Sequence, residues 1–132
     1  MGGQSQRGLL FLLLLLVMAS GIPGCGSGGA SPRLIDALLE QRAERLEAGQ
    51  RQAIVDGLVR AQRRTTVDAL LLLAVIEQES SYRAAARSPG GALGLMQLRP
   101  TTARDLAERH GLSWDGETTL LDPADNVLLG AI

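Results

Sequence analysis

The 132-residue sequence contains no lysine, one cysteine, one histidine and only three aromatic residues. A single cysteine excludes a disulfide framework within the chain, and it also excludes a cysteine-rich zinc site. All side-chain cations apart from the histidine are arginines, 13 of them against 14 acidic residues, which gives a net charge of −1. A charge this balanced offers no electrostatic reason to expect a nucleic acid as partner.

Long hydrophobic runs are also scarce. The longest, residues 9–19, is too short to cross a bilayer, which needs about 20 apolar residues. It fits the hydrophobic region of a secretory signal peptide. The length of the whole chain suits one modest domain, and its hydrophobic content of 45% is ordinary for a globular protein.

The only cysteine follows this run. Residues 22–25 read Ile-Pro-Gly-Cys and resemble a bacterial lipobox, in which the cysteine becomes the first mature residue and carries acyl chains. We therefore expect a lipoprotein signal peptide over residues 1–24, with a lipidated Cys25 and a flexible tether over residues 25–31. The alternative is an incidental thiol beside an ordinary cleavage site. Lipidation predicts an exported protein anchored to the cell envelope, on the outer membrane in a Gram-negative organism.

The rest of the chain predicts an all-α fold. Two amphipathic helices are expected over residues 32–64, the first beginning at Ser31-Pro32 and ending at Gly49. A third helix starts at Thr65 or Thr66 and is apolar on every side over residues 69–76, which predicts a buried central helix.

Residues 84–99 are rich in glycine and lack a period, so they predict a loop. A helix follows over residues 101–110 with Gly111 as its end, and another begins at Asp122-Pro123. No segment has the alternation of a strand.

The central helix ends in a polar stretch that holds two glutamates, Glu77 and Glu79. A carboxylate beside a buried helix, near the negative end of the helix dipole, suits a general acid because both surroundings favour its protonated form. The two residues lie about 200° apart around the helix axis, so periodicity does not choose between them. The alternative is that both are solvated residues at a helix end.

Two motifs in this part of the sequence resemble those of a known protein family. Residues 74–107 read AVIEQESSYRAAARSPGGALGLMQLRPTTARDLA. The Glu-Ser pair at Glu79 and Ser80 with an aromatic at Tyr82, followed by Gly-Leu-Met-Gln at residues 94–97, resembles the catalytic domain of the soluble-type lytic transglycosylases, a lysozyme-like family that cleaves peptidoglycan. The resemblance covers residues 65–132 and extends to Asp122-Pro123 and the Asn-Val that follows.

The resemblance implies roles for individual residues. Glu79 is the expected catalytic acid, and the substrate-binding residues are expected to be Ser80, Gly94, Leu95, Met96 and Gln97. Met96 would touch the sugar or, alternatively, pack in the core. The expected substrate is the glycan strand of peptidoglycan, and no cofactor or metal is implied.

The implied chemistry needs one carboxylate, whereas most glycosidases use two. The glutamic acid protonates the oxygen between N-acetylmuramic acid and N-acetylglucosamine. The sugar's own C6 hydroxyl then attacks C1, and a 1,6-anhydromuramic end forms without water.

The family's third motif, Ala-Tyr-Asn-Ala-Gly, does not occur in the sequence, so we expect a domain truncated at its C-terminus. Three alternatives follow. The chain could be a non-catalytic peptidoglycan-binding lipoprotein, a lysozyme-type hydrolase, or a fragment that does not fold stably.

Overall fold

The computed structural model describes residues 29–132, which form six α-helices with no strand among them. Two isolated β-bridges, Arg87 with Leu93 and Leu93 with Leu98, brace the long loop between two of the helices. The prediction of an all-α fold is confirmed for the described part of the chain. The predicted signal peptide and Cys25 lie outside the described residues.

Helices α2 (Pro32–Arg42) and α3 (Ala48–Arg64) form the N-terminal pair. The hydroxyl of Ser31 accepts a hydrogen bond from the Leu34 N–H and caps α2, as its sequence predicts. The predicted end of this helix at Gly49 is wrong, because α2 stops at Arg42 and Gly49 lies in the first turn of α3. Glycine keeps its backbone N–H and lowers helix stability only through backbone entropy, so a single glycine in the first turn does not stop the helix.

Helix α4 (Ala69–Ser80) is the predicted central helix, with its start corrected from Thr65 or Thr66 to the cap at Asp68. The Asp68 carboxylate accepts from the Leu70 N–H at 2.7 Å. One face of α4 enters the core through Leu72, Leu73 and Ile76, but Leu71 is 55% exposed. The expectation that residues 69–76 are buried on every side is therefore wrong on that face.

Helices α5 (Pro100–His110), α6 (Glu117–Leu121) and α7 (Pro123–Ala131) follow the long loop. Two local signals that the sequence predicted are confirmed. Gly111 ends α5 in the left-handed conformation, with φ of 63°, and the Asp122 carboxylate caps α7 by accepting from the Asp125 N–H at 2.9 Å. The short helix α6 was not predicted.

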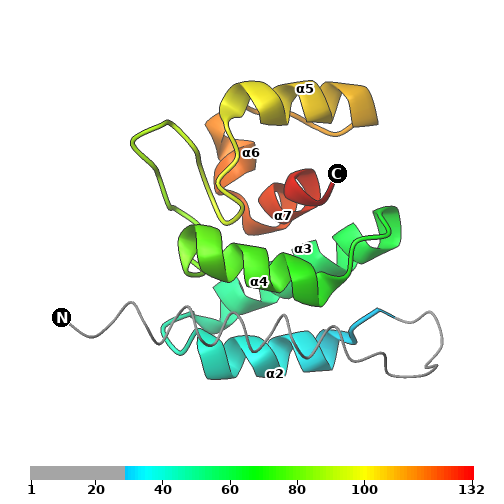
Figure 1. The fold of residues 1–132 in the computed structure, drawn as a ribbon, viewed down its shortest axis with the longest axis vertical. Helices are drawn as coiled ribbons and strands as arrows, with labels where there is room; N and C mark the ends of the chain where they lie inside the picture. The colour runs from blue at the N-terminus through cyan, green and yellow to red at the C-terminus, as the bar shows by residue number, and fades with distance from the viewer. Residues whose placement is uncertain (1–28) are drawn as a thin grey trace.

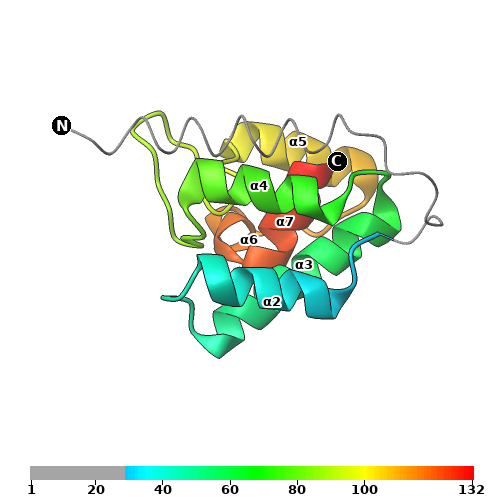
Figure 2. The ribbon, with the colours of Figure 1, turned by 60° about the horizontal axis from the view of Figure 1, so that its bottom comes forward.

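Helix α7 occupies the centre of the stack. It contacts α3 on one side and α5 and α6 on the other, and both views show it between them (Figure 1, Figure 2). At the crossing with α3, a Cβ on Gly57 would lie 2.9 Å from the Cα of Ala124, so a glycine at this position permits the close approach. Residues Asn126 to Leu129 are almost completely buried as a result.

The core forms two clusters. The larger joins α2, α3, α4 and α7 to Leu95 and Met96 of the long loop. The smaller lies under α5 and α6 and includes Leu93 and the half-buried Trp114. The loop therefore contributes apolar side chains to both clusters, which fixes it beside the C-terminal end of α4 (Figure 1).

Candidate active site

The first predicted motif lies where α4 ends. Ser80 is its last residue, and Ser81 and Tyr82 follow with φ of 49° and 63°. Two consecutive non-glycine residues in the left-handed region turn the chain sharply away from the helix axis. The Ser80 hydroxyl is buried and donates to the Ile76 carbonyl at 2.9 Å. Ser80 thus bonds its own helix, and its predicted contact with substrate stays a prediction.

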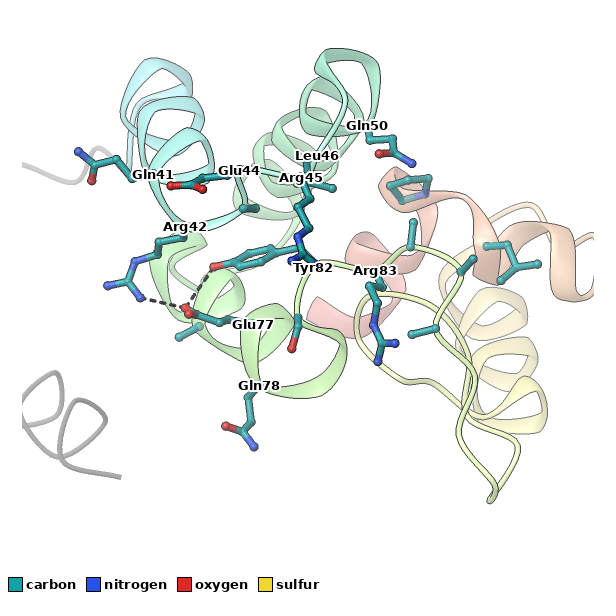
Figure 3. A pocket seen from close by; sticks show the side chains of 18 of the residues that line it. Gln41, Arg42, Glu44, Arg45, Leu46, Gln50, Glu77, Gln78, Tyr82 and Arg83 are labelled. Atoms are coloured by element: carbon teal, nitrogen blue, oxygen red, sulfur yellow. Dashed lines mark hydrogen bonds and ion pairs between the residues drawn. The ribbon is translucent and has the colours of Figure 1, made fainter. Parts of the chain in front are cut away.

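The structure separates the two candidate glutamates by their surroundings. Oε2 of Glu77 accepts from Arg42 at 2.9 Å and from the Tyr82 hydroxyl at 3.2 Å (Figure 3). Glu79 is exposed, and its carboxylate has no hydrogen bond or ion pair among residues 29–132. The sequence predicted a carboxylate beside a buried helix, but Glu79 is not buried by residues 29–132.

The structure fixes both the ring and the hydroxyl of Tyr82. Its ring is buried, with 4% of the residue exposed. Burial, followed by the negative charge and hydrogen bond of Glu77, raises the pKa of the Tyr82 hydroxyl above its ordinary value, and the Arg42 charge opposes this in part. The hydroxyl therefore remains a hydrogen-bond donor throughout the physiological pH range.

The second motif, residues 94–97, forms a tight turn in the long loop. Gly94 has φ of 78°, and a Cβ there would overlap the Leu120 carbonyl oxygen and the side-chain amide of Asn126. Leu95 is fully buried, and Met96 is 9% exposed and packs in the larger core cluster. Gln97 has φ of 48°, and its side-chain amide donates to the Gly94 carbonyl at 2.9 Å. Contact of these residues with a glycan stays a prediction.

Asn126 is the residue that holds this turn, and its role was not predicted from the sequence. It is fully buried on α7, and its Oδ1 accepts from the Met96 N–H at 2.7 Å. Its Nδ2 donates to the carbonyls of Leu93 and Leu120 at 3.1 and 2.9 Å. Asn126 lies one turn into a helix that begins at Asp122-Pro123. Nothing in the neighbouring sequence indicates that its side chain contacts residues 30 or more positions away.

Hydrogen bonds connect the two motifs through residues 83–86. The Ser80 carbonyl accepts from both the backbone N–H and Nε of Arg83, each at 3.1 Å. Three residues on, the Ala86 carbonyl accepts from the Gly94 N–H at 2.9 Å and from Nε2 of Gln97 at 3.3 Å. The end of α4 and the Gly-Leu-Met-Gln turn are therefore one connected unit.

A wide groove lies on the Glu77 side of α4. It has a volume of about 1490 Å³ and is lined by the connection between α2 and α3 and by residues 81–87 (Figure 3). Glu77 lines it but Glu79 does not. Among its lining residues are four arginines: Arg42, Arg45, Arg83 and Arg87.

Three further observations concern the described residues outside the two motifs. His110 is exposed at the end of α5, where a cation is favourable. Residues 29–132 hold no group of three or more His, Cys, Asp or Glu arranged as metal ligands. None of the helices in this part of the chain combines the length and the hydrophobicity that a bilayer crossing requires.

Comparisons with known proteins agree with this arrangement. The model of the transglycosylase SLT domain matches residues 58–132, beginning inside α3 and including both motifs. The chain belongs to this family, and its described helices have the lysozyme-like fold of a lytic transglycosylase.

Individual relatives give the same result. An endo-type membrane-bound lytic murein transglycosylase A of Klebsiella pneumoniae is 44% identical over 69 residues, which cover 49% of this chain and 33% of that protein. A membrane-bound lytic murein transglycosylase C of Mannheimia succiniciproducens is 42% identical over 72 residues, covering 53% and 20%.

Among solved structures, an inactive Glu→Gln variant of lytic transglycosylase Slt from Pseudomonas aeruginosa superposes with a TM-score of 0.53 at 35% identity. The match covers 56% of this chain and 12% of that one. The chain thus spans no more than a third of the length of these three relatives.

Proposed function

We propose that the chain carries the acid-bearing part of a peptidoglycan lytic transglycosylase, with Glu79 as the general acid and base. The observation that carries this assignment is the contrast between the two glutamates at the end of α4. Glu77 already bonds Arg42 and Tyr82, whereas Glu79 has no partner among residues 29–132 and is open to a substrate. A group that must give up and take back a proton needs an unoccupied carboxyl oxygen within reach of the substrate.

The reaction proposed is cleavage of the β-1,4 bond between N-acetylmuramic acid and N-acetylglucosamine. Glu79 protonates the glycosidic oxygen, which leaves with its sugar. The resulting carboxylate then accepts the proton of the muramic C6 hydroxyl as that oxygen bonds C1, so a 1,6-anhydro ring forms and no water is consumed. The family match and the relatives named as lytic murein transglycosylases support this choice of substrate and bond.

The Glu→Gln variant of the Pseudomonas protein is inactive, which supports an essential glutamate in that relative. Its counterpart here is tested by Glu79→Gln in the full chain, incubated with purified peptidoglycan and followed by mass spectrometry of the products. We expect anhydromuramic ends from the unaltered chain and a loss of at least about 100-fold in the variant, the usual contribution of a general acid. The matched control is Glu40→Gln, an exposed glutamate on α2.

The products also decide between reaction types. Reducing muramic ends without anhydro ends would identify a hydrolase. Binding of glycan strands with no product would identify a binding protein. An equal loss in Glu79→Gln and Glu40→Gln would remove the assignment of Glu79.

We place the protein at the cell envelope, attached through lipid on Cys25. The Klebsiella and Mannheimia relatives are named as membrane-bound, which supports this location. The test is expression of the full chain in bacteria fed a labelled fatty acid. Label should enter the unaltered protein and be lost in Cys25→Ser, and label in both would exclude this cysteine as the attachment point.

A further inference from the structure

The turn that follows α4 is held in a costly conformation. Ser81 and Tyr82 both have positive φ, a region that non-glycine residues adopt only at an energetic cost. Such a conformation persists only where neighbouring groups hold it. The turn begins two residues after Glu79, so whatever holds it also determines where the last turn of α4 points.

The groups that hold it lie on the opposite side of α4 from Glu79. The Tyr82 ring is buried and its hydroxyl donates to Glu77, while Arg42 donates to the same oxygen of Glu77 (Figure 3). The helix bond that precedes the turn, from the Ser81 N–H to the Glu77 carbonyl, measures 3.0 Å. Glu77 therefore contacts the turn through both its backbone and its side chain.

Arg42 belongs to a part of the chain that lies outside the family match. It is the last residue of α2, whereas the match begins at residue 58. The ion pair is only partly buried, with side-chain exposures of 36% for Arg42 and 44% for Glu77. An exposed pair of this kind adds little stability by itself, so its effect here is to hold the Glu77 carboxylate in place rather than to stabilise the fold.

We propose that Glu77, oriented by Arg42 and bonded to Tyr82, is a positioning residue that fixes the Ser81–Tyr82 turn and thereby the catalytic Glu79. The proposal rests on the proposed function for the role of Glu79. It assigns α2 a part in the activity, since one of its residues orients Glu77. Positioning of this type acts on rate, because a displacement of a reacting group by about 1 Å can cost up to 100-fold.

The contact can be tested without activity, because Tyr82 is the only tyrosine of the chain. An alkaline titration followed by tyrosinate absorbance reports this residue alone. In Glu77→Gln the pKa of Tyr82 should fall, since the charge of Glu77 is one of its causes. Amide hydrogen exchange of residues 81–83 should become faster in the same variant. An unchanged tyrosine titration together with unchanged exchange would overturn the proposal.

Measurements of enzyme activity test whether this contact positions Glu79. Glu77→Ala and Tyr82→Phe should each lower kcat by about 3- to 10-fold with little change in KM, as expected for loss of one hydrogen bond that the substrate does not touch. The double variant should be no slower than the slower single variant, because both remove the same bond. Arg42→Ala should lower kcat, and Arg42→Lys should restore most of it.

The outcomes separate the two proposals. If Glu77→Gln alters the Tyr82 titration but the two single variants multiply their effects on kcat, or leave kcat unchanged, positioning is wrong and the function of Glu79 stands. If the unaltered chain forms no anhydro product, the proposed function fails, and the hydrogen exchange of residues 81–83 still decides whether Glu77 holds the turn. Glu117→Gln, which breaks an exposed ion pair with Arg87, is the matched control and should change neither readout.

Discussion

The side-chain oxygen of Asn126 lies 2.7 Å from the backbone nitrogen of Met96, across 30 residues of sequence. Through this bond a helix near the end of the sequence fixes the turn that carries Gly-Leu-Met-Gln. The amide group of the same side chain uses both of its donors, so the buried asparagine is fully paired. A buried polar side chain that pairs every group is a strong and specific constraint on a loop.

Asn126→Ala should lower the free energy of unfolding by about 3 kcal/mol, because it leaves the Met96 N–H and the Leu120 carbonyl buried without partners and removes one of the two hydrogen bonds to the Leu93 carbonyl. Chemical denaturation followed by circular dichroism measures this. The control is Gln52→Ala, since Gln52 is exposed and bonds only Asp56 on its own helix; its expected change is within about 0.5 kcal/mol. Equal effects of the two substitutions would contradict the role given to Asn126.

Gly94→Ala should be strongly destabilising, by about 3 kcal/mol, because its φ is positive and the added Cβ would overlap Leu120 and Asn126. Gly49→Ala provides the comparison. That glycine lies in the first turn of α3 with open space around it, so alanine should stabilise the helix by about 0.5 kcal/mol. Thermal unfolding of both variants gives opposite shifts of Tm, and a stable Gly94→Ala would show that the turn can relax.

Two adjacent leucines of α4 should behave differently. Leu72→Ala removes a side chain that is 3% exposed and should cost about 2–5 kcal/mol. Leu71→Ala removes one that is 55% exposed and should change the free energy of unfolding by about 0.5 kcal/mol or less. Denaturant titration of the pair tests the orientation of α4, because a reversed order would mean that the helix is rotated about its axis.

Stability should fall in alkaline solution because of Tyr82. Its pKa is raised in the folded state, so above pH 10.0, the ordinary value, the unfolded chain releases this proton while the folded chain keeps it. Its contribution to stability is complete below that pH and is lost as the pH rises further, by up to about 1.4 kcal/mol per pH unit. The absence of lysine leaves this pH range free of other abundant side-chain titrations.

The measurement is the free energy of unfolding between about pH 10 and 11.5, below the range in which arginine loses its proton. Tyr82→Phe should be less stable at neutral pH, where it lacks the bond to Glu77, but should lose this alkaline slope. A slope identical in Tyr82→Phe and the unaltered chain would assign it to another group.

Local signals in the sequence were sufficient where the structure depends on neighbouring residues. Gly111 and Asp122 cap α5 and α7 through contacts within one helical turn, so the neighbouring sequence was enough to predict both caps. Helix α6 has five residues, too few to show an apolar period, so it was missed. The break after Arg42 contains neither glycine nor proline, which led to an end placed too late.

The site depended on contacts that no local pattern encodes. A run of leucines in α4 does not reveal which of them faces solvent, and Leu71 therefore looked like its buried neighbours. The choice between Glu77 and Glu79 followed from the family motif and not from periodicity. The structure adds the physical distinction through Arg42, which comes from 35 residues earlier in the chain.

Tyr82 and Trp114 are positioned to serve as intrinsic spectroscopic probes of the fold. Tyr82 packs in the larger core cluster beside α4, and Trp114 packs against the smaller one beneath α5 and α6. They are the only tyrosine and the only tryptophan of the sequence. Tryptophan fluorescence and tyrosine absorbance therefore follow the two halves of the fold separately, so a stepwise loosening of one half before the other is visible without any attached label.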